Sequence, residues 1–257
     1  MQLFGVKKIL GSNISQIKYI NAINQILYWV FNNESRIVFA ANVHMLMEAY
    51  DSQDFRKIVN SADLVTPDGI PLVWMLRLKG SRKQERVYGP TLMLYVLEAA
   101  ARGNIPVGFY GGSPEVVDLL VKKMNRKFSD LDIVYSYSPP YRILSDEEDN
   151  EVCKQIQAKG VRILFVGLGC PKQEIWISEH RWKIKAVMIG VGAAFDFHAG
   201  CKPQAPSWMQ AIGLEWLFRL LHEPHRLARR YLYNNPRFVV LALADILGTL
   251  MSRNKNG

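Results

Sequence analysis

Short runs of β-branched and aromatic residues alternate with segments of helical periodicity through most of this chain. Such alternation is typical of βα units wound around a largely parallel sheet, because each parallel strand needs a long crossover before the next. Strands are predicted at Arg36–Ala41, Asp63–Thr66, Val107–Gly111, Ile133–Ser136, Ile163–Gly167 and Val187–Val191. Helices are predicted at Ile14–Phe31, Leu92–Arg102, Pro114–Phe128, Ser145–Lys159 and Pro171–Trp182. The expected fold is α/β, with a Rossmann-like, mostly parallel sheet and flanking helices.

The pattern changes near residue 200, where the strand signals stop. Three further helices are predicted, at Trp208–Leu221, Glu223–Tyr233 and Pro236–Met251, separated by prolines. A chain of 257 residues can hold one large core and a smaller addition. We therefore expect an α/β catalytic core over residues 1–200 and a basic helical appendage over residues 201–257. The apolar run 238–251 is too short to span a bilayer, since as a helix it would cover only about 21 Å.

The charge of the chain indicates an anionic partner. Lys and Arg number 32 against 23 Asp and Glu, which gives a net charge of +9. The appendage carries eight Lys and Arg against three Asp and Glu, so five of these nine charges lie in it. Nucleic acid, phosphate-bearing small molecules and an anionic membrane surface all fit this charge. Three cysteines without a C-x-x-C pair fit a reducing cytosol, and the N-terminus lacks the pattern of a secretory signal.

Several predicted strands end in residues suited to ligand binding. Open α/β sheets bind ligands at the carboxyl ends of their strands. Glycines there let backbone approach a ligand, and a following helix N-terminus offers free N–H groups to phosphate. Any one such string fits an ordinary turn, but four at one sheet edge favour a ligand site. They contain Asn42, Asp68-Gly69, Gly111-Gly112 and Gly169-Cys170-Pro171-Lys172-Gln173-Glu174.

Asp68 is the candidate general base, because a carboxylate at a strand end can take a proton from an incoming hydroxyl. The alternative is that Asp68 only caps the helix that begins near Ile70. His44 and His198 are further acid–base candidates, although lone histidines in such loops are more often structural. No cofactor is expected, since neither a complete dinucleotide fingerprint nor a P-loop occurs.

A metal ion is not expected at the site. Asp130 and Asp132 match a D-x-D pattern but precede a strand, so they fall at the opposite sheet edge. No other spacing of His, Cys and Asp indicates a strong ligand cluster. Without a metal, fixed cations must neutralise a phosphorylated ligand.

The appendage offers such cations. Arg219, Arg226 and Arg230 are separated by seven and four residues, close to whole helical turns, and the planar guanidinium suits a diphosphate. A solvated helical face is the alternative. Apolar residues such as Trp208 and Trp216 are interleaved with the arginines, so this surface is expected to pack on the core, to meet lipid, or both.

Several strings, in this order, resemble the WecG/TagA/CpsF family of glycosyltransferases, glycosyltransferase family 26. They are Thr66-Pro67-Asp68-Gly69, Arg86-Val87-x-Gly89, Gly111-Gly112-x-Pro114-Glu115, Gly169-x-Pro171-Lys172-Gln173-Glu174, Gly190-Val191-Gly192 and Gly213-Leu214-Glu215-Trp216-Leu217-x-Arg219. The likeness runs from about residue 35 to residue 233 and includes Glu223-Pro224-x-Arg226 and Arg229-Arg230-Tyr231.

The resemblance implies an enzyme that moves a sugar from a UDP-sugar donor to an undecaprenyl-diphosphate-linked saccharide acceptor. It implies inversion of the anomeric centre, no bound metal, and a role in teichoic acid, common antigen or exopolysaccharide synthesis. The implied location is cytoplasmic, peripheral on the inner face of the cell membrane, whose anionic surface the appendage contacts. No nucleic acid partner is expected, and a homo-oligomer remains open.

The likeness also implies residue roles. Asp68 falls on the proposed catalytic base, Asn42 and Gln173 on polar residues near donor and acceptor, and Arg86 on a motif arginine. Folding of the appendage over the core is expected to assemble the site. The remaining expected substrate-binding residues are Gly111, Gly112, Gly169, Lys172, Glu174 and three appendage arginines that engage diphosphate, Arg219, Arg226 and Arg229.

The chain departs from the family at Ala40-Ala41-Asn42 and Gly89-Pro90-Thr91-Leu92. These departures leave the sugar open among N-acetylmannosamine, its uronic acid and glucose. The rival interpretation is a polyanion-binding or nucleic-acid-binding α/β module without catalysis, with the appendage as a clamp. That interpretation lacks a recognition motif.

Overall fold

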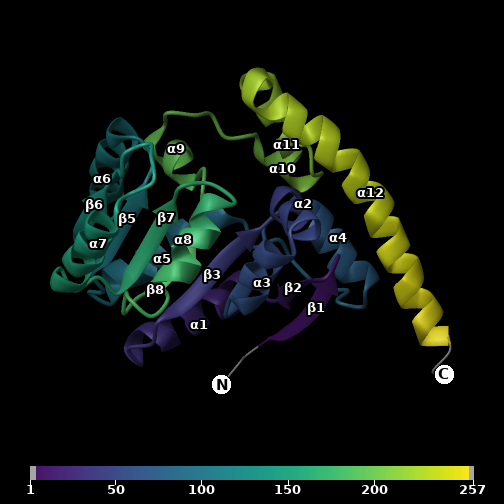
Figure 1. Ribbon diagram of the computed structural model, residues 1–257, viewed down its shortest axis with the longest axis horizontal. Coiled ribbons are helices and arrows are strands. Elements are labelled where there is room, and N and C mark those ends of the chain that lie inside the picture. The colour runs from purple at the N-terminus through teal and green to yellow at the C-terminus, as the bar shows by residue number, and fades with distance from the viewer. Residues whose placement is uncertain (1–3, 255–257) are drawn as a thin grey trace.

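A six-stranded parallel sheet forms the centre of the computed structural model, which describes residues 4–254 (Figure 1). The strand order is β4-β3-β8-β7-β5-β6, and every neighbouring pair is parallel. The predicted α/β, Rossmann-like class is confirmed, and each of the six predicted strands agrees with the structure to within one residue. The strands are β3 (Arg36–Ala41), β4 (Leu64–Pro67), β5 (Val107–Gly111), β6 (Ile133–Tyr137), β7 (Ile163–Gly167) and β8 (Val187–Gly190).

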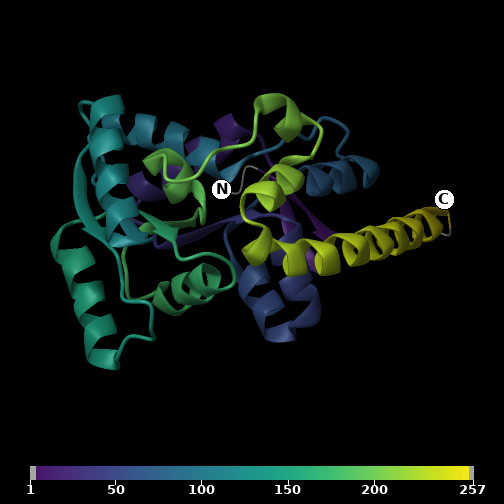
Figure 2. The ribbon, with the colours of Figure 1, turned by 90° about the horizontal axis from the view of Figure 1, so that it is seen from above.

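Helices cover both faces of the sheet (Figures 1 and 2). Alternate residues of β7 enter two different apolar clusters: Leu164 and Val166 enter one, and Ile163 and Phe165 the other. This division follows from the two-residue period of a strand that is buried on both faces. One face packs on α1 (Tyr19–Phe31), α5 (Gly89–Arg102), α6 (Pro114–Lys127) and α9 (Ala194–Ala199). The other packs on α2 (Val43–Asp51), α3 (Gln53–Ser61), α4 (Ile70–Leu78), α7 (Asp146–Ala158) and α8 (Lys172–His180).

An antiparallel hairpin of β1 (Gly5–Ile9) and β2 (Ser12–Gln16) precedes the sheet. The prediction of a helix from Ile14 onward is therefore wrong over its first residues. Ile14, Ile17 and Ile20 have helical spacing, but Ile14 pairs with Lys7 across the hairpin, and α1 begins only at Tyr19. Leu10 and Gly11, both with positive φ, form the tight turn that makes this pairing possible.

The C-terminal region differs from its predicted helices at two points. The helix predicted at Trp208–Leu221 is two helices, α10 (Ser207–Ala211) and α11 (Glu215–His222), because Gly213 at φ +78° ends the first. The two helices predicted around Pro236 are one helix, α12 (Pro224–Asn254). A proline removes one backbone hydrogen bond, but buried Asn234 and Phe238 hold the helix to the core on either side of Pro236. No helix within residues 4–254 is long and apolar enough to cross a membrane.

Helix α12 packs along the core beside α2 and α4 (Figure 1). Its Phe238 and Ala242 belong to the apolar cluster that includes Phe39 of the central sheet. The Nζ of Lys79 donates a 2.9 Å hydrogen bond to Asp245, and Arg237 pairs with Asp51 through both terminal nitrogens. The last helix is thus a packed part of the molecule.

Replacing Phe238 tests this docking. Phe238→Ala should lower the free energy of unfolding by about 3–5 kcal/mol, because it leaves a cavity in the apolar cluster. The matched control is Val240→Ala, two residues along the same helix and 67% exposed, which should change stability by less than about 0.5 kcal/mol. Urea unfolding measures both, and equal effects of the two substitutions would contradict the docking.

Candidate active site

Asp68 lies at the carboxyl end of β4 and is buried. Its backbone N–H and that of Gly69 both donate to the Ala41 carbonyl, at 2.9 and 3.1 Å, which fixes it beside β3. Its Oδ1 accepts a 2.7 Å hydrogen bond from the Gly89 amide. Burial raises the pKa of Asp68 to about 6, although the Arg86 charge and the Gly89 hydrogen bond act in the opposite direction. The capping interpretation is wrong, since Gly69 is the N-cap of α4 and no side chain caps it.

Glu215 of α11 joins the appendage to this strand end. Its carboxylate pairs with Arg86 at 2.6 Å and accepts a 3.0 Å hydrogen bond from the Tyr88 hydroxyl. The Arg86 guanidinium also donates through Nε to the Asp68 carbonyl and lies 3.8 Å from the centre of the Tyr88 ring. Arg86 lowers the pKa of Asp68 and Glu215 raises it, so the appendage affects the protonation of the candidate base. Sequence reasoning did not assign Glu215, although a quoted motif contains it.

Asn42 follows β3 and lies against Asp68-Gly69. Its Oδ1 accepts a 3.2 Å hydrogen bond from the Met45 amide and so caps α2. A Cβ at Gly69 would come 3.3 Å from the Asn42 Cα, so the two strand ends approach closely. Because Oδ1 forms the cap, the Asn42 side-chain NH₂ group is the part suited to a ligand.

Gln173 and Glu174 are buried at the start of α8 and brace the loops after β7 and β8. The Gln173 amide donates to Glu174 at 2.6 Å and accepts from the Gly192 backbone N–H at 3.0 Å. Burial raises the pKa of Glu174 to about 7, partly offset by the Gln173 hydrogen bond. Both side chains therefore shape the loops around the site.

Two arginines of the appendage reach this region. The Arg219 charge lowers the pKa of Asp68, and the Arg230 and Arg219 charges add to burial in lowering the pKa of His44 to about 4. His44 is thus neutral at physiological pH. The Nε of Arg219 is buried without a hydrogen-bond partner within the described part of the chain. A buried, unsatisfied guanidinium nitrogen is suited to an anionic ligand.

Other predicted residues lie outside this cluster. Arg226 is exposed and pairs with Glu223 at 2.7 Å, and Arg229 is exposed on the same helix. Lys172 is also exposed, with its Nζ 4.8 Å from the Tyr141 ring centre. The structure brings Arg230 toward the site more closely than Arg226 or Arg229, because Arg230 is half-buried and acts on His44.

The three predicted glycines serve different needs. A Cβ at Gly111 would lie 2.6 Å from the Gly167 backbone, so glycine is required for the packing of β5 against β7. Gly112 is exposed, and its backbone N–H donates to the Gly167 carbonyl at 3.1 Å. Gly169 has φ +79° with open space around its Cα, so only its backbone conformation demands glycine.

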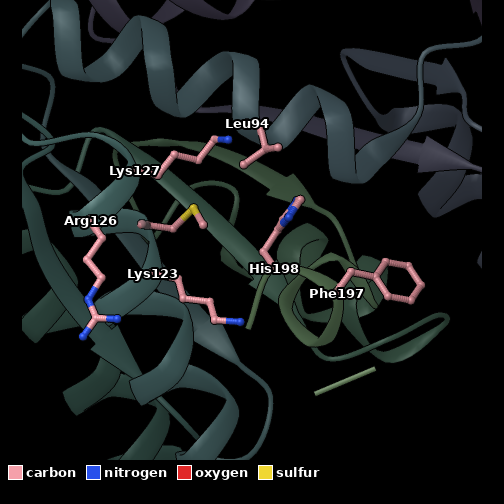
Figure 3. Close-up of a pocket in the computed structure, with 7 residues that line it drawn as sticks. Leu94, Lys123, Arg126, Lys127, Phe197 and His198 are labelled. Carbon is pink, nitrogen blue, oxygen red and sulfur yellow. The ribbon is translucent and has the colours of Figure 1, made fainter. Parts of the chain in front are cut away.

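A shallow hollow of about 410 Å³ lies between α5, α6 and α9 (Figure 3). It adjoins the site through Phe197, whose ring centre is 5.7 Å from the Arg219 guanidinium. His198 also lines it, and its Nε2 lies 2.9 Å from the carbonyl of Pro90, next to Gly89. The hollow is lined by Leu94, Lys123, Met124, Arg126, Lys127, Phe197 and His198. Sequence reasoning missed this basic surface, whose cations come from the last turns of α6.

A second cluster missed from the sequence joins α7 to the end of α8. The possible ligand atoms of Asp149, Cys153 and His180 all lie within 4.8 Å of one another. The expectation that His, Cys and Asp form no strong cluster rested on sequence spacing. Residues of two different helices cannot be paired by spacing.

A buried carboxylate and arginines at the carboxyl edge of a Rossmann-like sheet suit the transfer of a group away from a phosphorylated carrier, the chemistry of a glycosyltransferase. The comparison with known proteins agrees with this class. The chain belongs to the Glycosyl transferase WecG/TagA/CpsF family, whose sequence profile matches residues 7–251. The predicted resemblance is confirmed, and it extends beyond the range of 35 to 233 expected from the motifs.

Two similar proteins come from Bacillus, and both are named N-acetylglucosaminyldiphosphoundecaprenol N-acetyl-beta-D-mannosaminyltransferase. The one from Bacillus spizizenii is 32% identical over 212 residues, which cover 82% of this chain and 80% of the relative. The one from Bacillus subtilis is 30% identical over 210 residues, which cover 81% of this chain and 79% of the relative.

Proposed function

We propose that this glycosyltransferase moves a sugar from a UDP-sugar to an undecaprenyl-diphosphate-linked saccharide, with inversion and without a metal ion, in the synthesis of a cell-surface polysaccharide. The observation that carries the proposal is a buried carboxylate, Asp68, held beside Arg86 with Arg219 in electrostatic reach. The names of the two relatives make an N-acetylmannosaminyl donor and an N-acetylglucosaminyl-diphospho-undecaprenol acceptor the first pair to test.

Asp68 acts as the general base in a single displacement. The acceptor hydroxyl oxygen bonds to the anomeric carbon, the bond from that carbon to the UDP oxygen breaks, and Asp68 takes the hydroxyl proton. Because the Gly89 amide holds Oδ1 at 2.7 Å, Oδ2 is the oxygen available to the acceptor. A pKa of about 6 leaves the carboxylate ionised at neutral pH yet more basic than an exposed aspartate.

Positive charge supplied by the protein stabilises the departing UDP diphosphate. Arg219 and Arg230 are the half-buried arginines near His44, and a desolvated guanidinium acts strongly on developing negative charge. The exposed Arg229, and Arg226, which is exposed although paired with Glu223, meet the acceptor diphosphate or lipid headgroups. The segment 201–257 thereby completes the site.

The appendage also attaches the enzyme to the inner membrane surface. Exposed apolar residues recur along one side of α12 at Leu232, Val239, Leu243 and Leu247, at spacings of seven, four and four. The segment 201–257 carries a net charge of +5, as eight basic minus three acidic residues. At about 1 kcal/mol per basic residue near an anionic leaflet, such charge supports peripheral binding without a spanning helix.

A transfer assay tests the proposal. UDP-N-acetylmannosamine, its uronic acid analogue and UDP-glucose are each offered with a short-chain lipid-diphosphate N-acetylglucosamine. We expect one donor to give a product whose anomeric configuration, measured by NMR, is opposite to that of the donor, and we expect the rate to persist in EDTA. Retained configuration would exclude the single displacement. A loss in EDTA that magnesium or manganese restores would exclude metal independence.

Asp68→Asn tests the base. It keeps the acceptor for the Gly89 amide but cannot take the proton, so turnover should fall at least about a hundredfold with an unchanged circular dichroism spectrum. The exposed Asp54 provides the matched control, Asp54→Asn, which should leave turnover unchanged. Wild-type kcat/KM should rise with pH up to about 6, where Asp68 loses its proton, and then level off. Near-normal turnover in Asp68→Asn would remove this residue from the mechanism.

Arg219→Ala tests the diphosphate contact. Loss of one charge-assisted hydrogen bond should lower kcat/KM and weaken inhibition by UDP at least about tenfold. Arg102→Ala, on the exposed end of α5, controls for loss of net positive charge and should match the wild type. If both variants behave alike, Arg219 has only a structural role.

A further inference from the structure

Asp149, Cys153 and His180 bring together three side chains of the types that bind metal ions. Asp149 and Cys153 are four residues apart on α7, so they lie on one helix face, and His180 is the last residue of α8. Cys153 and His180 are buried, and the Asp149 side chain is 20% exposed, which leaves a path from solvent. The three ligand atoms lie within 4.8 Å of one another.

The His180 ring is held in the orientation that metal-ligating histidines adopt. Its Nδ1 lies 2.6 Å from the Trp176 carbonyl, and since a carbonyl only accepts, Nδ1 carries the proton. The ring stacks on Trp176 at 4.0 Å, and Trp176 stacks on Tyr110 at 4.3 Å. Nε2 is thereby directed at the Asp149 carboxylate, 2.8 and 2.9 Å from its two oxygens. A backbone carbonyl that binds the other ring nitrogen is the usual outer support of a histidine ligand.

An ion pair alone accounts for two of the three groups. An imidazolium donating to Asp149 satisfies His180, while Cys153 beside the carboxylate contributes only to the packing of the apolar cluster. A cation between the three groups uses all of them. Tetrahedral nitrogen and oxygen ligands at about 2.0 Å and one sulfur at about 2.3 Å from a metal stand roughly 3.3–3.5 Å apart. The separations in the cluster, which are within 4.8 Å, therefore have to shorten by at most about 1.3 Å.

Charge and donor type select the cation. A thiolate and a carboxylate together balance a divalent ion, while His180 binds as neutral imidazole, and one nitrogen, one oxygen and one sulfur donor suit zinc better than magnesium or calcium. Lys183 is the nearby cation, with its Nζ 3.4 Å from Asp149, and its half-exposed side chain can turn to solvent. Binding releases the Cys153 thiol proton and the proton on His180 Nε2.

We propose that Asp149, Cys153 and His180 form a binding site for a zinc-class divalent cation that ties α7 to α8, with water at the fourth position. The site is distinct from the transferase machinery, because His180 lies seven residues, about two helical turns, beyond Gln173. The proposal does not rest on the proposed transfer reaction. A cation bound there would act on the transferase site only indirectly, through α8, the helix that begins at Lys172 and carries Gln173 and Glu174.

Cobalt provides the direct test, because a Co²⁺–thiolate bond gives a charge-transfer absorbance that a carboxylate or imidazole alone does not. The full-length protein, stripped with a chelator, is titrated with Co²⁺ and then with Zn²⁺. We expect the band to saturate near one equivalent of Co²⁺ and to disappear as Zn²⁺ displaces it. Absence of the band in the wild type would overturn the site, leaving the ion pair alone.

A matched pair of cysteine variants identifies the ligand. Cys153→Ser keeps the side-chain volume and should abolish the band and weaken zinc binding at least about tenfold. Cys201→Ser, at an exposed cysteine, should retain both. As a second measurement, stoichiometric zinc should raise the melting temperature of the wild type and of Cys201→Ser, but not of Cys153→Ser. A band or a thermal shift that survives in Cys153→Ser would also overturn the proposal.

Discussion

The carboxylate of Asp68 is withdrawn from water, and the residues around it act on its ionisation. Burial disfavours the ionised form and raises its pKa. The Gly89 amide and the Arg86 charge counter this effect and bring its pKa to about 6. Gly89 must approach closely to do so, since a Cβ there would lie 3.1 Å from the Ala40 side chain. The turn before α5 is therefore built around the candidate base.

The positive charge of partly buried Arg86 is balanced by a carboxylate from the C-terminal part of the chain. Glu215 binds both Arg86 and Tyr88, with each side of the ion pair 15% exposed. Breaking such a pair leaves an uncompensated charge in a partly desolvated place, so the contact fixes α11 against the strand ends. Further along, Phe238 enters the apolar core and Asp245 accepts from Lys79, which holds α12. The appendage is a structural extension of the α/β unit.

The sequence predicts the sheet well and the tail poorly, for physical reasons. Strands β3, β5 and β7 have their predicted bounds because their apolar runs are buried on both faces and end at turn residues. The hairpin is missed since Ile14 and Ile17 fit a helix as well as a strand, and only pairing with β1 decides between the two. Pro236 predicts a break, but core packing outweighs the lost hydrogen bond.

In the candidate site, strand-end position predicts that Asp68 and Asn42 lie at one sheet edge, and the structure brings these two strand ends together. Glu215 could not be assigned from the sequence, and the spacing that singled out Arg219, Arg226 and Arg230 could not separate the half-buried pair from exposed Arg226, since both depend on how α11 and α12 pack against the core. Gln173 lies at the start of the helix that follows β7, and its amide is bonded to Glu174 and Gly192, a bracing that spacing alone does not reveal. Sequence spacing also could not predict the contact between Asp149 and His180, because the two residues lie on different helices.

The Glu215 contact has a consequence for how members of this family can be recombined. A junction placed near residue 200 would exchange the acidic residue that balances Arg86, together with the whole basic segment 201–257. A foreign tail without a carboxylate at that position would leave Arg86 to act on Asp68 alone, making the base more acidic and weaker. Exchanging the tail therefore also changes the basicity of Asp68, and a chimera has to supply an equivalent carboxylate beside Arg86.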